Sequence, residues 1–512
     1  MQRNEEQNGR VQLKCMDRVL PVEVTAEITL PDYRSEISRL LWVRPTFLPA
    51  SRFVGNGKID FSGPVCYRIL YVGPDGALYG ADSEGSYDFS LPREAAESFD
   101  MSRGIEAAAE ILPDAVISRV LGPRKISVRC RLHTRVQCYA EKDLSPRFRG
   151  EGSDADKIHR LCDAMENGRM LVSEAEGLQL EDRVTPEQGG GELRLISARG
   201  SLFLPEVSAV EDAVRCRGEA LIRLLCCREE EGEREEPFVL TRRIPFEKLI
   251  PLGGIMPDWQ ASAAGEIARI SATVEEGAIT VSAEALLSAQ GQCEESVLLY
   301  RDVFLPGSHV ECRCAEEPLW RCSYCGNRNF SVSGERPFAE LGIPADATVL
   351  DAVADAEIKE KQREGDRTVL AGELRCHVLY RRAEDYEIGE FSIPFRGILE
   401  ESADDMALSC HVISCRVTPT AEGLRVDAEI GLAVRAYRGC AVSCLAEAAF
   451  TAAEPMPRAD LELCYPALDD SLWSVGKRYG VSPDDLAAAN GLPAEAPGSA
   501  ESLRDVRYLL IP

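Results

Sequence analysis

A long-period repeat is the feature that most constrains the fold of this 512-residue chain. The segments "FSGPVCYRILY", "CRGEALIRLLC" and "LAGELRCHVLY" align at Gly63, Gly218 and Gly372, which are 155 and 154 residues apart. Each segment alternates in polarity before an apolar end, which is typical of a strand with one face on a core. A period this long favours tandem domains that each bury a core of their own, rather than a solenoid of small repeats.

Flanking elements recur in the same order and indicate that each unit is mostly β. A strand-like pair follows each copy, and "RKISV", "GAITV" and "GLRVD" come after turn-prone Gly or Pro positions. Each pair is therefore predicted to be a hairpin. Between the two halves lies a short strand with a Pro-bearing turn, "YDFSLP", "RRIPF" and "FSIPF". This spacing of turns predicts a sandwich- or barrel-like unit of about 120–140 residues.

The first unit carries two further local signals. Ile37, Leu40 and Leu41 follow Pro31 at helical spacing, which predicts a short amphipathic helix. Asn56-Gly57 is predicted to form a hairpin turn. The same stretch reads "GNGK", but it lacks the upstream glycine spacing and the Ser or Thr of a phosphate-binding loop.

Charge and hydropathy limit the classes of partner and the location. The formal net charge is −27 and no dense Lys/Arg run occurs, so binding to nucleic acid or to an anionic membrane surface is not expected. The N-terminal "MQRNEEQNGRVQLK" has no apolar segment of a secretory signal, and no run reaches the roughly 18 apolar residues of a spanning helix. We therefore expect a cytoplasmic protein.

The C-terminal stretch "DDSLWSVGKRYGVSPDDLAAANGL" predicts two short helices. Asp470 or Ser471 can cap the first helix, and Gly480 supplies the left-handed residue that ends it. Ser482 and Pro483 begin the second helix, with Asp485 completing a capping box. The strand-like "LELCY" and "VRYLLIP" flank the helices, so the predicted order is β-α-α-β in about 50 residues. The side chains expected to face the core are Leu472, Trp473, Val475, Tyr479, Leu486 and Ala489.

Catalytic and metal-binding motifs are scarce. None of the five histidines lies in a zinc-protease or nucleophile-elbow motif, so we expect no enzymatic activity and no cofactor. Most of the 19 cysteines are expected to be reduced and partly buried. One alternative stays open, a structural zinc site in "ECRCAEEPLWRCSYCGN", although its first pair has the less common C-x-C spacing. Its ligands would be Cys312, Cys314, Cys322 and Cys325.

The segment "LPDYRSEI" followed by "GPVCYRILYV" resembles the SPOCS domain, a β-rich module of spore-forming Firmicutes. Three such units before a small C-terminal domain resemble SipL-like spore-envelope morphogenetic proteins, and the resemblance spans nearly the whole chain. It implies a mainly β protein of three tandem domains. The implied divisions are an N-terminal tail at 1–18, SPOCS-like domains at 19–142, 158–308 and 318–452, and a small β-α-α-β domain at 461–512.

The last segment resembles the LysM domain nearly residue for residue. In that family, the loops before the first helix and after the second form a shallow groove for N-acetylglucosamine-containing glycans. The departure is "SLRDVRYLLIP", which replaces the usual Pro-Gly-Gln turn, together with a longer loop "PAEAPGSAES". The groove positions implied for this sequence are Asp470, Ser471, Leu472, Asn490, Gly491 and Leu492.

The resemblance implies two partners for this groove. In SipL-like proteins the domain is associated with a protein, the ATPase of the spore coat's basement layer. The chain would then be a non-enzymatic scaffold in the mother-cell cytoplasm at the forespore surface, where several modules on one chain raise the effective concentration. The alternative is a protein that binds peptidoglycan glycan. A cell-wall hydrolase is a third class, but the repeat leaves no further domain to hold its catalytic residues.

Overall fold

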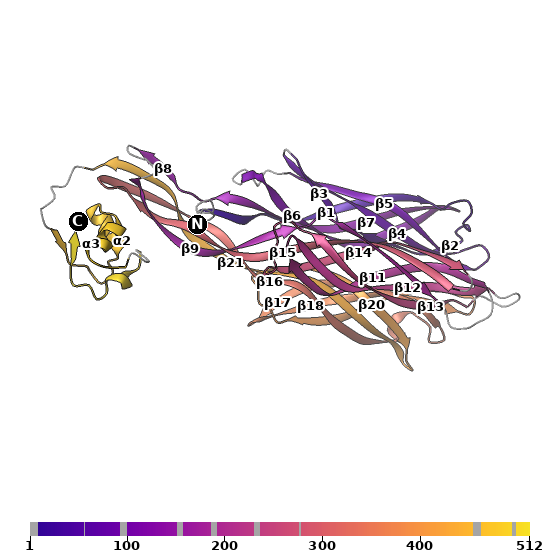
Figure 1. Cartoon of the computed structure of the whole chain (residues 1–512). Helices are drawn as coiled ribbons and strands as arrows, with labels where there is room; N and C mark the ends of the chain where they lie inside the picture. Colours follow the sequence, from indigo (N-terminus) through magenta and orange to yellow (C-terminus); the bar gives the residue numbers. More distant parts are fainter. Residues whose placement is uncertain are drawn as a thin grey trace.

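The computed structural model describes residues 9–55, 57–92, 100–150, 157–185, 192–229, 236–275, 278–453, 462–493 and 498–512. These residues form a mainly β protein with a short helical region at the C-terminal end, as predicted (Figure 1). The long strands belong to three pairs of sheets, which we call units 1, 2 and 3. The domain boundaries themselves stay a prediction.

Unit 1 pairs a three-stranded sheet, β1-β7-β6, with a second sheet in which β4 lies between β5 on one side and β2 and β3 on the other. Side chains of both sheets form one core. β1 begins at Arg10, inside the stretch predicted as a tail, because residues from Arg10 onward pair with β7. The strands are β1 (Arg10–Thr29), β2 (Arg39–Phe47), β3 (Ser51–Val54), β4 (Lys58–Val72), β5 (Leu78–Pro92), β6 (Asp100–Gly122) and β7 (Lys125–Asp143).

Two local predictions in unit 1 have different outcomes. The helix expected at residues 37–41 is wrong, because this segment leads into β2, which pairs with β4. A β-bulge between Leu40 and Trp42 inserts an extra residue and breaks the two-residue alternation, so the apolar spacing resembles that of a helix. The hairpin at Asn56-Gly57 is confirmed by the pairing of β3 with β4 and by φ +89° at Gly57, while Asn56 lies outside the described residues.

Units 2 and 3 repeat the two-sheet arrangement, each around its own core. The short β8 (Arg147–Gly150) follows unit 1 and pairs in parallel with β21 of unit 3. Unit 2 consists of β9 (His159–Val172), β10 (Glu176–Val184), β11 (Glu192–Val210), β12 (Ala213–Glu229), β13 (Phe238–Pro251), β14 (Gln260–Glu275) and β15 (Ala278–Phe304). Unit 3 consists of β16 (Ser308–Pro337), α1 (Phe338–Leu341), β17 (Thr348–Glu364), β18 (Arg367–Arg382), β19 (Asp385–Leu399), β20 (Asp405–Pro419) and β21 (Gly423–Ala452).

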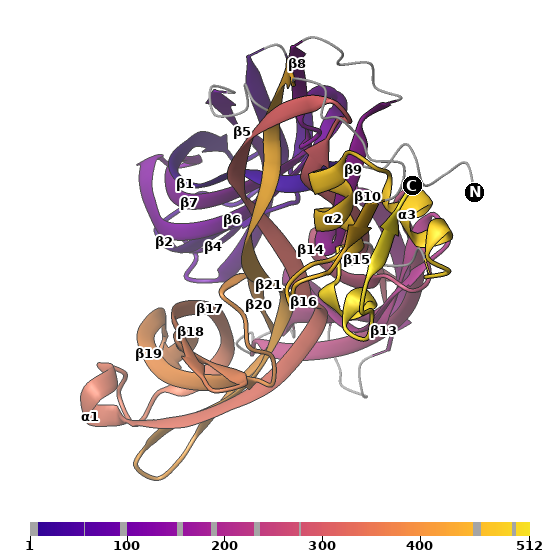
Figure 2. The ribbon, with the colours of Figure 1, turned by 90° about the vertical axis from the view of Figure 1, so that its left-hand side faces the viewer.

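The three units surround a common axis and each contacts the other two (Figure 2). One buried cluster contains Leu70, Leu225 and Leu379, each seven residues after its repeat glycine. The repeat therefore places equivalent side chains together at the centre. Ion pairs and hydrogen bonds join neighbouring units, namely Arg68 Nη2 to Ile267 O (3.1 Å), Arg223 Nε to Asp351 Oδ1 (2.9 Å) and Arg44 Nη2 to Asp355 Oδ1 (2.6 Å).

The C-terminal module lies at one end of this β body (Figure 1). Its order is β-α-α-β, as predicted, with its own small core. β22 and β23 form a two-stranded antiparallel ladder beside the two helices. The elements are β22 (Glu462–Cys464), α2 (Leu472–Tyr479), α3 (Pro483–Ala489), the 3-10 helix η3 (Ala500–Leu503) and β23 (Leu509–Ile511).

Candidate functional site

The loop before α2 is held by hydrogen bonds of its own residues. Ser471 caps α2 and forms a reciprocal capping box with Ser474. The Asp470 carboxylate accepts hydrogen bonds from the Ala467 N–H at 2.9 Å and from Arg478 Nη2 at 2.5 Å. Burial raises the pKa of Asp470, but these hydrogen bonds outweigh burial and hold the pKa below its usual value. The side chains of Asp470 and Ser471 are thus engaged in shaping the loop.

Leu472, the third predicted groove residue of this loop, is 0% exposed in the core of the module. Its side chain therefore cannot lie under a sugar ring without unfolding the module. Only four residues earlier, Leu468 is 92% exposed. The loop therefore presents a different leucine from the one that the sequence indicated.

The loop after α3 begins with an asparagine that extends the sheet. Asn490 exchanges two hydrogen bonds with the backbone of Leu510, through Nδ2 at 2.8 Å and Oδ1 at 2.7 Å. Gly491 is exposed and has φ +65°, a left-handed conformation that favours glycine. Leu492 packs partly against the module core. In α3 itself Ala487 is buried and Ala489 is exposed, so the expectation that Ala489 faces inward is wrong.

Exposed apolar side chains near the first loop were missed from the sequence. Tyr465 and Tyr508 are exposed, as is Leu468. Tyr465 follows Cys464 and Tyr508 precedes Leu509, and these two neighbours are paired across the β22–β23 ladder. The two tyrosines therefore extend from the same end of the ladder. Their positions just outside two short strands gave no periodic signal by which to find them.

One face of α2 is used to attach the module to unit 2. Trp473 was expected in the core of the module, but its indole packs edge-on against Phe304 with ring centroids 5.0 Å apart. Its Nε1–H donates to Asp302 Oδ2 at 2.8 Å, and Lys477 Nζ lies 2.7 Å from both carboxylate oxygens of Asp302. Burial raises the pKa of Asp302, but the bonds from Lys477 and Trp473 outweigh it and lower the pKa. Residues 465 and 467–469 stay exposed beside this contact.

The cysteine cluster does not form a zinc site. All four cysteines lie on the single strand β16, and ten residues of a strand span about 33 Å, far more than the Zn–S bond of about 2.3 Å allows. Cys312 and Cys314 are exposed, whereas Cys322 contacts Gln292 and Cys325 contacts Ser262 in the interior. Within the described ranges, no group of three or more His, Cys, Asp or Glu side chains is arranged to hold a metal.

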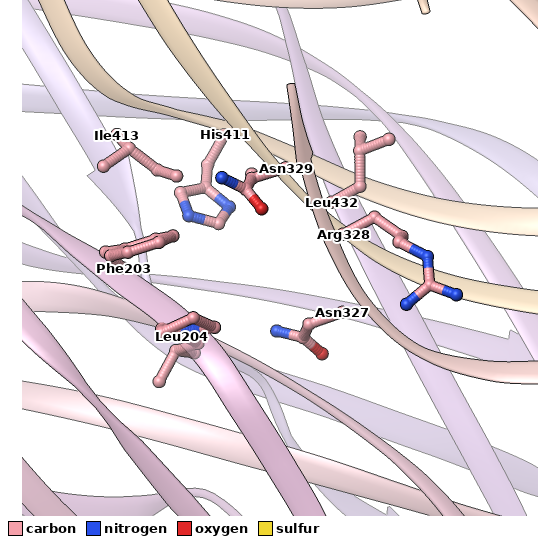
Figure 3. A pocket seen from close by; sticks show the side chains of 10 residues that line it. Phe203, Leu204, Asn327, Arg328, Asn329, His411, Ile413 and Leu432 are labelled. Carbon is pink, nitrogen blue, oxygen red and sulfur yellow. The ribbon is translucent and has the colours of Figure 1, made fainter. Parts of the chain in front are cut away.

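A small cavity of about 20 Å³ lies between units 2 and 3 (Figure 3). It has room for about one water molecule. His411 Nε2 lies 2.9 Å from the Leu202 carbonyl, and Asn327 bonds both the N–H and the carbonyl of Ala263. Burial lowers the pKa of His411, so the imidazole is neutral. These polar groups are used in joining two units, and the cavity is too small for an organic ligand.

Comparison with known proteins identifies the C-terminal module. Residues 468–496 match the LysM domain family. This module is a LysM domain. The LysM fold suggests that it binds glycan such as peptidoglycan. No curated protein and no solved structure matches the chain. The SPOCS and SipL-like resemblance of the β units therefore stays a prediction. In the part of the chain that the structure describes, no helix has the length and apolar character to cross a membrane.

Proposed function

We propose that this protein binds an N-acetylglucosamine-containing glycan, such as peptidoglycan, through its LysM domain. The observation that carries this proposal is the LysM match at residues 468–496, in a module whose first loop stays exposed while α2 is attached to the β body. Leu468 and Tyr465 offer the apolar surface that a shallow glycan site needs, and Gly491 at the end of α3 is also exposed. The three β units act as a non-enzymatic scaffold that holds this site at one end.

Co-sedimentation of the full chain with insoluble peptidoglycan tests this function. We expect the chain to pellet, and we expect Leu468→Asp to reduce pelleting because a charge replaces an exposed apolar contact. Ile398→Asp is the control, since Ile398 is an exposed apolar residue on β19 of unit 3, outside the LysM domain. The substitution Leu472→Glu is unsuitable here, because that side chain is buried in the module core. Absence of pelleting, or equal loss in both variants, would contradict glycan binding by this loop.

A second function follows from the SPOCS and SipL-like resemblance. The chain would act in the mother-cell cytoplasm at the forespore surface and dock on the ATPase of the spore-coat basement layer. The exposed Tyr465 and Tyr508 favour this alternative, because aromatic residues are enriched at protein interfaces. Binding of the purified ATPase to the full chain, with loss in Tyr465→Ala and no pelleting with peptidoglycan, would favour this function over glycan binding.

A further inference from the structure

The outward face of the β22–β23 ladder carries large apolar side chains. Cys464 and Leu509 are paired across the ladder and are 3% and 0% exposed, because both face the module core. Side chains alternate along a strand, so the neighbouring Leu463, Tyr465 and Tyr508 point the other way. These three side chains are 44%, 71% and 56% exposed, as the alternation requires. The ladder therefore has one buried apolar face and one exposed apolar face.

The two tyrosines of this face differ from the tyrosines that hold the β units together. Tyr71, Tyr87 and Tyr380 are buried, and their hydroxyls donate to a carbonyl or carboxylate oxygen at 3.0, 2.6 and 2.5 Å. Among the described residues, neither Tyr465 nor Tyr508 forms a ring contact or a side-chain hydrogen bond. The side chains of this tyrosine pair therefore contribute little to the fold, and they are available to a ligand.

The attachment of α2 to the β body leaves this face open. Leu472 and Val475 on α2 pack toward the ladder in the module core, whereas Trp473 and Lys477 contact unit 2. The ladder and unit 2 therefore lie on different sides of α2, and the outward face of the ladder points away from that helix. The module itself lies at one end of the molecule (Figure 1). A polymer can approach this face without displacing α2 from unit 2.

The chemistry of the face fits a neutral sugar ring. One side of a pyranose is a patch of C–H groups, and its hydroxyl and acetamido groups lie at the rim. Opposite residues on neighbouring strands have Cβ atoms about 4.5–5.5 Å apart, so Tyr465 and Tyr508 give one continuous apolar surface with a hydroxyl on each ring. The side chains of Leu463 and Leu510 beside them are also uncharged. The net charge of −27 repels an acidic ligand, but it does not repel a neutral amino sugar.

We propose that the glycan lies on the outward face of the β22–β23 ladder, with one N-acetylglucosamine ring stacked on Tyr465 and Tyr508. This inference rests on the proposed function, and it locates the ligand on a face that the groove between the two loops does not include. The LysM match at residues 468–496 argues for a glycan as the occupant. Continuity with the exposed Leu468, three residues after Tyr465, argues for the same occupant.

Fluorescence anisotropy of a dye-labelled N-acetylglucosamine oligomer, titrated with the full chain, tests this location. We expect Tyr508→Ser to raise the dissociation constant at least about tenfold, because it removes an aromatic anchor. Tyr508→Phe keeps the ring and should recover most of this loss. Tyr33→Ser is the matched control, since Tyr33 is 83% exposed in unit 1, and it should bind like the wild type. Because Tyr508 is exposed, Tyr508→Ser should keep the wild-type unfolding midpoint.

The outcomes separate this inference from the proposed function. Absence of binding by the wild type would contradict both. Binding by the wild type with equal affinity in Tyr508→Ser would overturn the location on the ladder and leave glycan binding by the LysM domain intact. Equal losses in Tyr508→Ser and Tyr508→Phe, or in Tyr508→Ser and Tyr33→Ser, would overturn ring stacking. Loss of binding to the basement-layer ATPase in Tyr508→Ser, with unchanged glycan affinity, would assign this face to a protein partner instead.

Discussion

At the residue scale, two leucines four positions apart distinguish a folding role from a binding role. Leu472→Ala is expected to lower the free energy of unfolding of the LysM domain by about 2–5 kcal/mol, since it removes a fully buried side chain and leaves a cavity. Leu468→Ala is expected to change it by less than about 0.5 kcal/mol, because Leu468 makes little contact with the fold. Urea denaturation of the full chain measures both changes in the free energy of unfolding. Equal changes would contradict a folding role for Leu472 and a binding role for Leu468.

A second prediction at the residue scale concerns Glu266, at the contact of unit 2 with Arg68 of unit 1. Burial raises the pKa of Glu266 to about 7, although the charge of Arg68 opposes the rise. A raised folded-state pKa contributes stability that is fully present below the unfolded value of about 4.3 and is lost as the pH rises through about 7. Glu266→Gln should remove this loss, which is worth up to about 3 kcal/mol.

Unfolding midpoints of wild type and Glu266→Gln at about pH 5 and about pH 8, on either side of that pKa, measure the effect. The wild-type chain should be less stable at the higher pH, and the variant should show a smaller difference. The prediction is contradicted if the wild-type chain is more stable at the higher pH and Glu266→Gln shows the same difference between the two pH values. Glu266 would then be ionised at both.

At the scale of elements, the Asp302 carboxylate accepts the polar contacts that attach α2 to unit 2, beside the packing of Trp473 against Phe304. Asp302→Ala removes the acceptor of both Trp473 and Lys477, so the LysM domain should separate from unit 2 and the radius of gyration should rise in X-ray scattering. Asp163→Ala is the control, because Asp163 on β9 forms an exposed ion pair with Arg301 at 3.4 Å within unit 2 itself. Because the bonds from Lys477 and Trp473 outweigh burial and lower the pKa of Asp302, its charge and the contact persist as the pH falls to the usual aspartate range and are lost only below that range. An unchanged radius in Asp302→Ala would contradict this attachment.

The elements also show what the sequence could predict. Ser471, Gly480 and Ser482 delimit the two helices where the sequence indicated, because capping depends on residues a few positions apart. The bulge at Leu40 was read as a helix, since an inserted residue changes the apparent period. Trp473 could not be assigned to unit 2 from local spacing, because its partner Asp302 is 171 residues away.

At the scale of the whole molecule, Asp351 of unit 3 joins two arginines of unit 2. Its side chain is 1% exposed, and it accepts hydrogen bonds from Arg199 Nη2 at 2.7 Å and Arg223 Nε at 2.9 Å. Asp351→Asn leaves two guanidinium groups without a compensating charge, at an expected cost of about 3–5 kcal/mol. Since the units share buried clusters, we expect one cooperative unfolding transition in the wild type. Calorimetry measures the loss of stability in Asp351→Asn and the number of unfolding transitions in the wild type. Three separate transitions would contradict a shared core.

We propose that the exposed loop of the LysM domain binds glycan while the β body holds it in place. Isothermal titration of the full chain with soluble N-acetylglucosamine oligomers measures this binding. We expect saturable binding that is weakened by Leu468→Asp and retained in Ile398→Asp. Absence of heat from binding in the folded wild-type chain, or identical affinity in all three proteins, would contradict it.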